Sequence, residues 1–132
     1  MQGKEKIAME EEKRIKTYRD LIAWQKAMDL VVHAYQLTTQ FPKSERFGLM
    51  IQMRRAAVSI PSNIAEGYAR QSRVDYVRFL KTARGSLAEL QTQTLLSERL
   101  RFVRASEQFS QLLSETDRVL QGLIRSLESK QT

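Results

Sequence analysis

The sequence predicts an all-α protein, folded as an antiparallel up-down-up-down bundle of four helices. Apolar residues recur at helical spacing in four separate blocks, whereas no run of β-branched residues alternates with polar ones. Only two prolines and five glycines occur in 132 residues. Because the connectors between the blocks are short, we expect each helix to run antiparallel to the next.

The first helix is expected from about Asp20, as its N-cap, to Gln40. It carries two apolar stripes: Trp24, Met28, Val31, Tyr35 and Thr38 form one, and Ala23, Ala27, Leu30, Ala34, Leu37 and Phe41 form the other. Two stripes predict a helix that is covered on more than one side, a feature typical of a subunit in an oligomer.

The second helix is expected from about residue 45 to residue 69, after a break at Pro42 and with Ser44 as its cap. Its inward residues are predicted to be Phe47, Met50, Ile51, Val58, Ile64, Ala65 and Tyr68. Pro61 lies inside this helix and leaves two interpretations open. The helix kinks and continues, which the unbroken apolar spacing favours, or it stops and restarts with Asn63 and Glu66 as a capping pair.

The third and fourth helices have clearer limits, because Ser72 and Ser106 are each placed to cap one of them. We expect the third to end near Ser97 and the fourth to continue to about residue 130. The apolar stripe of the third helix comprises Tyr76, Leu80, Ala83, Leu87, Leu90 and Thr94. The stripe of the fourth comprises Phe109, Leu112, Leu113, Thr116, Val119, Leu120, Leu123, Ile124 and Leu127. Residues 18–130 thus form the predicted bundle, and residues 1–17 a charged tail expected to be disordered.

Antiparallel pairing about the turn near Gln71 places Ala56 and Ala57 opposite Gly85 and Ser86. These small side chains predict a close approach of the second and third helices. Such an approach explains a glycine inside the third helix, where it costs about 1 kcal/mol of helix stability relative to alanine.

The same antiparallel pairing of the second and third helices places Arg54 opposite Glu89 and therefore inside the bundle. A buried guanidinium needs a carboxylate partner, so we predict that Glu89 pairs with Arg54 or Arg55. Glu66 is likewise expected to form a structural ion pair.

The formal net charge of the chain is +7. Residues 1–17 hold five bases and four acids, whereas residues 18–132 hold 17 bases and 11 acids. Thirteen of those 17 bases are arginines, whose planar guanidinium suits contacts with phosphate and also interfacial ion pairs. The composition fits a nucleic-acid-binding protein and equally an oligomer held by ion pairs.

The bases form two groups that are candidates for nucleic-acid contact. The first contains Arg70, Arg73, Arg78, Lys81 and Arg84, and the second, in the last connector, contains Arg99, Arg101 and Arg104. Within the first group, Arg73, Lys81 and Arg84 fall within about 80° on a helix. Phosphate contact and a role limited to assembly or solubility both remain open.

Side chains that could carry chemistry are few. The chain has no cysteine and one histidine, His33, four residues after Asp29, which is too small a set for a metal site. Glu66 and Glu89 are expected roughly 20 Å apart along the bundle, too far to share a substrate. We therefore expect no catalytic residue, no metal and no cofactor. With no signal peptide and no run near the roughly 20 apolar residues of a membrane span, we expect a cytoplasmic protein without a membrane partner.

Three segments of the sequence, in this order, resemble those of a known protein family. They are "YRDLIAWQKAMDLV", "FPKSERFGLMIQMRRAAVSIPSNIAEGYAR" and "DYVRFLKTARGSLAELQTQ". Together they closely resemble the four-helix-bundle family of proteins encoded in intervening sequences of bacterial 23S ribosomal RNA genes, over residues 18–125. The resemblance implies a ring-like homopentamer. Related bundles are accessory subunits of reverse transcriptases in diversity-generating retroelements and bind nucleic acid through a basic surface.

Residues and resemblance together predict a non-enzymatic, homo-oligomeric bundle that binds structured RNA or another nucleic acid through arginine-rich faces. The alternative is a protein–protein scaffold or accessory subunit, whose partner is a protein and whose charge is incidental.

Overall fold

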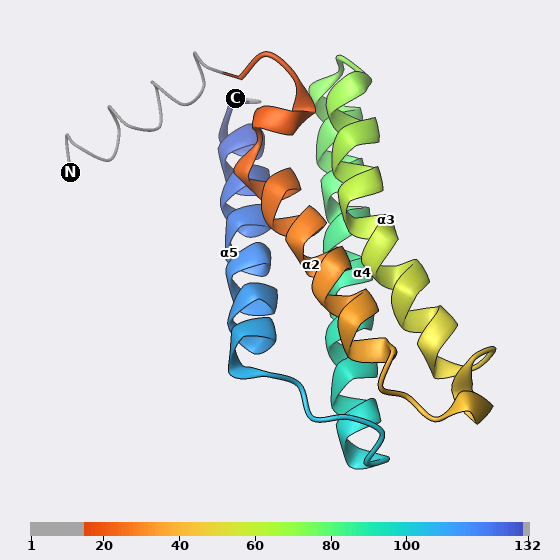
Figure 1. Cartoon of the computed structure of the whole chain (residues 1–132). Coiled ribbons are helices and arrows are strands. Elements are labelled where there is room, and N and C mark those ends of the chain that lie inside the picture. The colour runs from red at the N-terminus through yellow and green to blue at the C-terminus, as the bar shows by residue number, and fades with distance from the viewer. Residues whose placement is uncertain (1–14, 131–132) are drawn as a thin grey trace.

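The computed structural model describes residues 15–130 of the chain, and this part contains four long helices and no strand. The long helices are α2 (Ile22–Thr38), α3 (Leu49–Ala69), α4 (Arg73–Arg99) and α5 (Glu107–Ser129), with short 3-10 helices η1 (Tyr18–Asp20) and η2 (Lys43–Glu45). Each long helix packs against its neighbours in sequence, and α5 closes the arrangement by packing against α2 (Figure 1). The predicted antiparallel four-helix bundle is confirmed.

Two of the three predicted serine caps, Ser72 and Ser106, are confirmed. The Ser72 hydroxyl accepts a hydrogen bond from the backbone N–H of Asp75, and the Ser106 hydroxyl accepts one from Phe109. The prediction for Asp20 was wrong, because this residue ends η1 and its carboxylate accepts from the backbone N–H of Thr17. The first long helix begins after Leu21, which provides no side-chain cap.

Two residues of the predicted tail, Ile15 and Thr17, contact the folded part of the chain. Ile15 packs against the core, and the Thr17 side chain caps η1. Residues 1–14 of the predicted tail lie outside the described residues.

The start of α3 differs from the prediction. Ser44 lies inside η2 and does not cap α3, which begins only at Leu49. The Glu45 carboxylate provides the hydrogen bond to the first turn that a capping side chain would make, because its Oε1 accepts from the Leu49 N–H at 3.2 Å.

Pro61 bends α3 without ending it, as the favoured interpretation predicted. The helix is continuous from Leu49 to Ala69. Figure 1 shows its C-terminal half beside α4 and its yellow N-terminal half leaning away from α4. Asn63 does not cap a new helix, since its side-chain amide donates to the carbonyl oxygen of Ser59 at 2.8 Å.

The core is formed by one face of each helix. The second apolar stripe of α2 is buried, whereas Met28 and Tyr35 of the first stripe are each 41% exposed. The predicted faces of α4 and α5 are confirmed. That of α3 was partly wrong: only Ile64 of its seven predicted residues is fully buried, and Phe47 and Val58 are 84% and 41% exposed. The other residues that α3 buries are Leu49, Met53, Ala56, Ala57, Ile60, Pro61 and Gly67. Apolar residues surround most of α3, so periodicity alone did not show which face would pack.

The close approach of α3 and α4 lies at Gly67 and not at Gly85. A Cβ on Gly67 would lie 2.6 Å from the Cβ of Phe79, whereas a Cβ on Gly85 would meet nothing within 4 Å. The two helices are also shifted by three residues from the predicted pairing, which placed Ser86 opposite Ala56. In the structure the Ser86 hydroxyl lies 2.8 Å from the hydroxyl of Ser59. The proposed reason for Gly85 was therefore wrong.

Near this close approach, Tyr76 packs its ring edge-on against Tyr68, with 5.9 Å between the ring centroids. Its hydroxyl is buried and has no hydrogen-bond partner among residues 15–130. Burial, followed by the charge of Tyr68, raises the pKa of Tyr76 above its usual value near 10.

We expect Tyr76→Phe to leave stability at pH 7 unchanged or to increase it by up to about 1 kcal/mol, because an unsatisfied buried hydroxyl is removed. The folded protein holds the Tyr76 proton to higher pH than the unfolded chain does. The wild type should therefore lose stability as the pH rises above about 10, and the variant should lose less. Urea unfolding at pH 7 and at pH 10.5 measures both effects, and a marked loss at pH 7 would contradict them.

Candidate nucleic-acid interface

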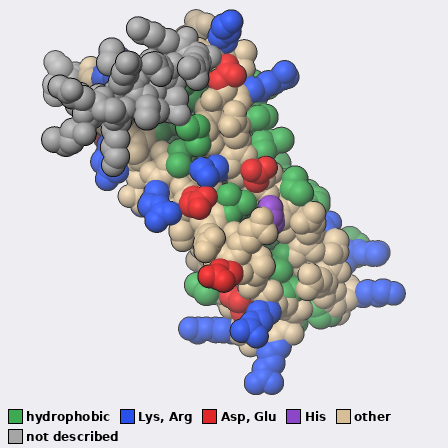
Figure 2. All heavy atoms as spheres, turned by 60° about the vertical axis from the view of Figure 1, so that its left-hand side comes forward, with side chains coloured by type: hydrophobic (Ala, Val, Ile, Leu, Met, Phe, Trp, Pro, Cys, Tyr) green, Lys and Arg blue, Asp and Glu red, His purple; other side chains and the backbone are tan. Residues whose placement is uncertain are grey.

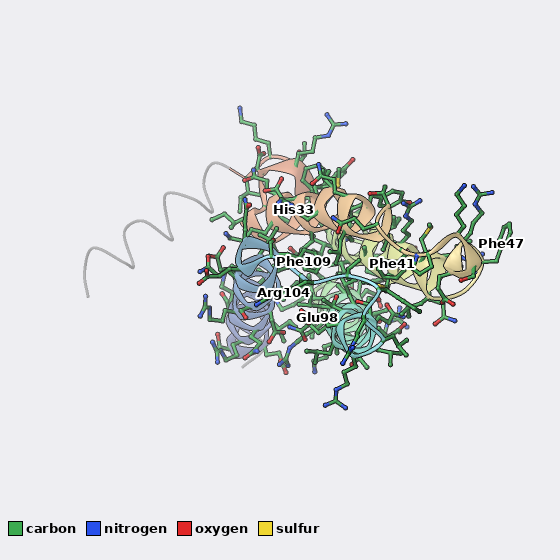
Figure 3. All side chains as sticks on the ribbon, turned by 60° about the horizontal axis from the view of Figure 1, so that its bottom comes forward. His33, Phe41, Phe47, Glu98, Arg104 and Phe109 are labelled. Carbon is green, nitrogen blue, oxygen red and sulfur yellow. The ribbon has the colours of Figure 1, made fainter. Side chains whose placement is uncertain are left out.

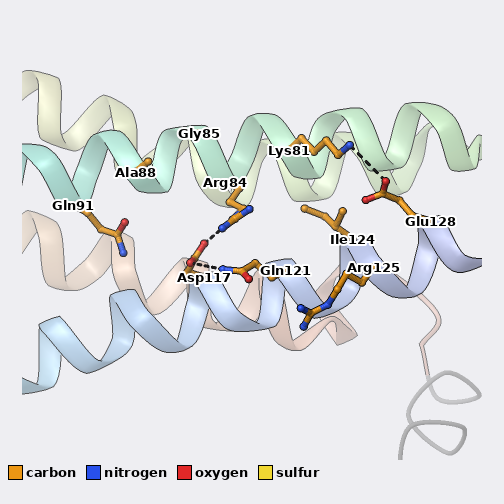
Figure 4. A pocket seen from close by; sticks show the side chains of 10 residues that line it. All are labelled: Lys81, Arg84, Gly85, Ala88, Gln91, Asp117, Gln121, Ile124, Arg125 and Glu128. Atoms are coloured by element: carbon orange, nitrogen blue, oxygen red, sulfur yellow. Dashed lines mark hydrogen bonds and ion pairs between the residues drawn. The ribbon is translucent and has the colours of Figure 1, made fainter.

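Three bases of α4, Arg73, Lys81 and Arg84, share one helix face as predicted, and we call them the α4 stripe. This face lies against α5, and Figure 4 shows Lys81 and Arg84 reaching across to it. The contacts join Arg84 Nε to Asp117 at 2.9 Å, Lys81 Nζ to Glu128 at 3.7 Å, and Arg73 Nη1 to the carbonyl oxygen of Lys130 at 2.5 Å. The α4 stripe thus links two helices of the bundle.

The remaining two bases of the first group form short-range pairs. Arg70 binds Glu66 at 3.0 Å, and Arg78 binds Asp75 at 3.1 Å. Both guanidinium groups also lie over the ring of Phe79, at 5.1 and 5.5 Å from its centroid. The structural ion pair predicted for Glu66 is therefore present.

These exposed pairs add little stability, on the order of 0–1 kcal/mol each. They nevertheless matter for recognition, because a nearby carboxylate reduces the positive potential that a phosphate meets. Of the five bases in the first group, four have a carboxylate partner and the fifth, Arg73, binds a carbonyl oxygen.

The bases at the end of α4 (Arg99) and in the connector to α5 (Arg101 and Arg104) differ from the first group. Arg99, Arg101 and Arg104 are exposed, and none of them forms an ion pair with any described residue. The carboxylate of the nearby Glu98 is bound by the backbone, since its Oε2 accepts a hydrogen bond from the Ala105 N–H at 3.2 Å.

The connector begins with a specific helix ending. The Phe102 N–H donates to the carbonyl oxygen of Ser97, and the Arg101 N–H donates to that of Glu98. This pattern is a Schellman motif, in which the position of Arg101 is usually glycine. Arg101 adopts the required left-handed conformation with φ of 62°, which costs a residue with a Cβ about 1–2 kcal/mol.

A second connector reaches the same end of the bundle. The α2–α3 connector carries Lys43 and Arg46, which are exposed and have no ion pair within the described chain. The rings of Phe41 and Phe102 join the two connectors, with centroids 5.6 Å apart. We call Lys43, Arg46, Arg99, Arg101 and Arg104 the basic end, and Figure 2 shows basic side chains projecting at this lower end.

The contribution of Lys43 and Arg46 was missed from the sequence although its signal was present. In an up-down-up-down bundle the first and third connectors lie at the same end. Bases in these two connectors must therefore share one surface, even though the sequence separates them by more than 50 residues.

The predicted pair of Glu89 with Arg54 or Arg55 was wrong, because no ion pair of Glu89 occurs among the described residues. Arg54 turns toward α2, where its Nε donates to the Thr38 hydroxyl at 2.9 Å and its guanidinium lies 4.4 Å from the centroid of the Tyr35 ring. The C-terminus of α2 supplies carbonyl oxygens and the negative end of a helix dipole, which stabilise a cation without a carboxylate.

Within residues 15–130, no cluster of three or more potential metal ligands occurs, and none of the helices is long and apolar enough to cross a membrane. The fold and the charges of the described residues define the class of this protein: an all-α bundle with bases gathered at one end, where they form no ion pair within residues 15–130.

Comparison with known proteins identifies the group within this class. The chain belongs to the family described as 23S rRNA-intervening sequence protein, which matches residues 19–125. The chain is also similar to a crystal structure from Bacteroides thetaiotaomicron, described as a protein of unknown function from the S23 ribosomal protein family. The TM-score is 0.70 at 23% identity, over 79% of this chain and 96% of that one. No curated protein matches the sequence.

Proposed function

We propose that this protein is a non-enzymatic, homo-oligomeric bundle that binds structured RNA or another nucleic acid through the basic end. One observation carries the proposal: the five bases of this end have no ion-pair partner in the described chain, whereas four of the five bases around α4 do. Unpaired exposed cations release counterions from nucleic acid without first breaking an internal contact, so they contribute fully to salt-dependent binding.

Arg101 supports this choice of surface. A glycine would adopt its backbone conformation without strain, so the stability of the connector gives no reason for an arginine here. Residues held in strained backbone conformations cluster at functional sites.

The test compares two variants with the same change in net charge. Arg99→Gln, Arg101→Gln, Arg104→Gln removes three bases of the basic end, and Arg78→Gln, Lys81→Gln, Arg84→Gln removes three paired bases. Binding of a structured RNA and of duplex DNA is measured by fluorescence anisotropy at several salt concentrations. We expect the slope of log affinity against log salt to fall by about 2–3 for the first variant, close to one per lost phosphate contact, and by less than 1 for the second.

Equal effects of the two variants would show that net charge and not this surface decides binding. No binding by the wild type at low salt would end the nucleic-acid proposal and favour the alternative, a scaffold whose partner is a protein.

The oligomeric part of the proposal rests on the outer surface of α2 and α3. Met28 and Tyr35 are each 41% exposed, Val32 is 54% exposed, and Val58 of α3 is 41% exposed. Exposed apolar side chains gathered on neighbouring helices are typical of a subunit interface. Light scattering gives the assembly mass, for which the family resemblance implies five subunits. A stable monomer at micromolar concentration would contradict the proposal.

A further inference from the structure

Phe47, in the connector between α2 and α3, is unusually exposed for an aromatic residue. Its side chain is 84% exposed, the largest value among the large hydrophobic residues of the described chain. Figure 3 shows it projecting outward beyond the ribbon, whereas Phe41 of the same connector lies among the helices. Phe41 is only 6% exposed, so the connector buries one ring and presents the other.

The backbone around Phe47 is fixed by hydrogen bonds. Successive turns join the N–H groups of Glu45, Arg46 and Gly48 to the carbonyl oxygens of Pro42, Lys43 and Glu45. The carboxylate of Glu45 binds the start of α3, and a Cβ on Gly48 would approach its Oε1 to 2.9 Å. These contacts hold the backbone of the connector from which the exposed Phe47 ring projects.

The two bases nearest in sequence, Lys43 and Arg46, are exposed and have no ion pair within the described residues. Glu45, the acid between them, is engaged with the backbone of Leu49. An exposed aromatic ring beside unpaired cations is the arrangement with which proteins bind single-stranded nucleic acid, since the ring stacks on a base and the cations contact phosphates.

We propose that Phe47 stacks on an unpaired nucleobase while Lys43 and Arg46 contact the adjoining phosphates. The ligand class is therefore nucleic acid with accessible bases, in loops, bulges or single strands, and not a fully paired duplex. The inference rests on the proposed function and deepens it. A second copy of the chain fits this site less well, because a protein interface over Phe47 would desolvate two cations that have no carboxylate partner.

The test uses the full chain with two fluorescent probes, an unstructured 20-nucleotide RNA and an RNA duplex of the same length. Phe47→Ala should weaken binding of the single strand roughly 5- to 140-fold, the range for loss of one base–aromatic stack, and leave duplex binding unchanged. Phe47→Trp should restore single-strand binding. Val74→Ala serves as the matched control, because Val74 is 70% exposed on α4 and lies outside the basic end.

The outcomes separate this inference from the proposed function. If the wild type binds both probes and Phe47→Ala binds them equally well, the stacking inference is wrong and the basic end still stands. If Phe47→Ala lowers the assembly mass in light scattering, the ring belongs to a subunit contact, which also overturns stacking. If the wild type binds neither probe, both proposals fail together.

Discussion

Gly67→Ala should destabilise the protein by about 1–3 kcal/mol, although alanine is the better helix former. The added Cβ would lie 2.6 Å from the Cβ of Phe79 and 3.3 Å from the Tyr76 ring. Because the Cβ of Phe79 is fixed to the backbone of α4, it cannot yield by rotating, and the two helices must move apart. Urea unfolding followed by circular dichroism measures the loss.

Gly85→Ala is the matched control, since the substitution is the same and the position is also helical. A Cβ at Gly85 meets nothing within 4 Å, so we expect a gain of about 0.5–1 kcal/mol from helix propensity alone. Similar effects of the two substitutions would show that α3 and α4 do not approach as described.

A second large effect is expected from Asp117→Asn combined with Glu128→Gln. These carboxylates bind Arg84 at 2.9 Å and Lys81 at 3.7 Å, so their neutralisation frees two bases of the α4 stripe. We expect tighter nucleic-acid binding and a salt slope steeper by up to about 2, because each freed base can contact one phosphate. Anisotropy titrations over a range of salt concentrations measure the change.

The control for this gain is Asp29→Asn combined with Glu89→Gln. It raises the net charge by the same amount, but neither carboxylate pairs with a base among the described residues. If the control steepened the slope as much, the ion pairs of α4 and α5 would be irrelevant to binding.

Local chemistry predicted some features of the fold correctly, although the caps expected from Asp20 and Ser44 do not form. Ser72 and Ser106 cap the helices that follow them, because a serine hydroxyl can accept a hydrogen bond from an N–H group of the first helical turn. The stripes of α4 and α5 are strongly one-sided, and the core therefore follows from their spacing. Pro61 remains within a continuous helix because the apolar pattern on both sides of it is in phase.

Features that depend on the relative placement of helices were harder to predict. Because α3 and α4 are shifted by three residues from the predicted pairing, their close contact lies at Gly67 and not at the predicted Gly85. The face that α3 turns toward α2 carries Arg54, which therefore binds Thr38 and not Glu89. Spacing placed the α4 stripe on one face correctly, but only the structure shows that this face meets acceptors on α5.

The central claim is that unpaired bases of the basic end contact nucleic acid and that paired bases of α4 do not. Ultraviolet cross-linking of the wild-type protein to RNA, followed by mass spectrometry of the peptides, locates the contact directly. Cross-links should concentrate in residues 99–105 and 43–47. Cross-links confined to residues 73–84 and to α5 would contradict the claim.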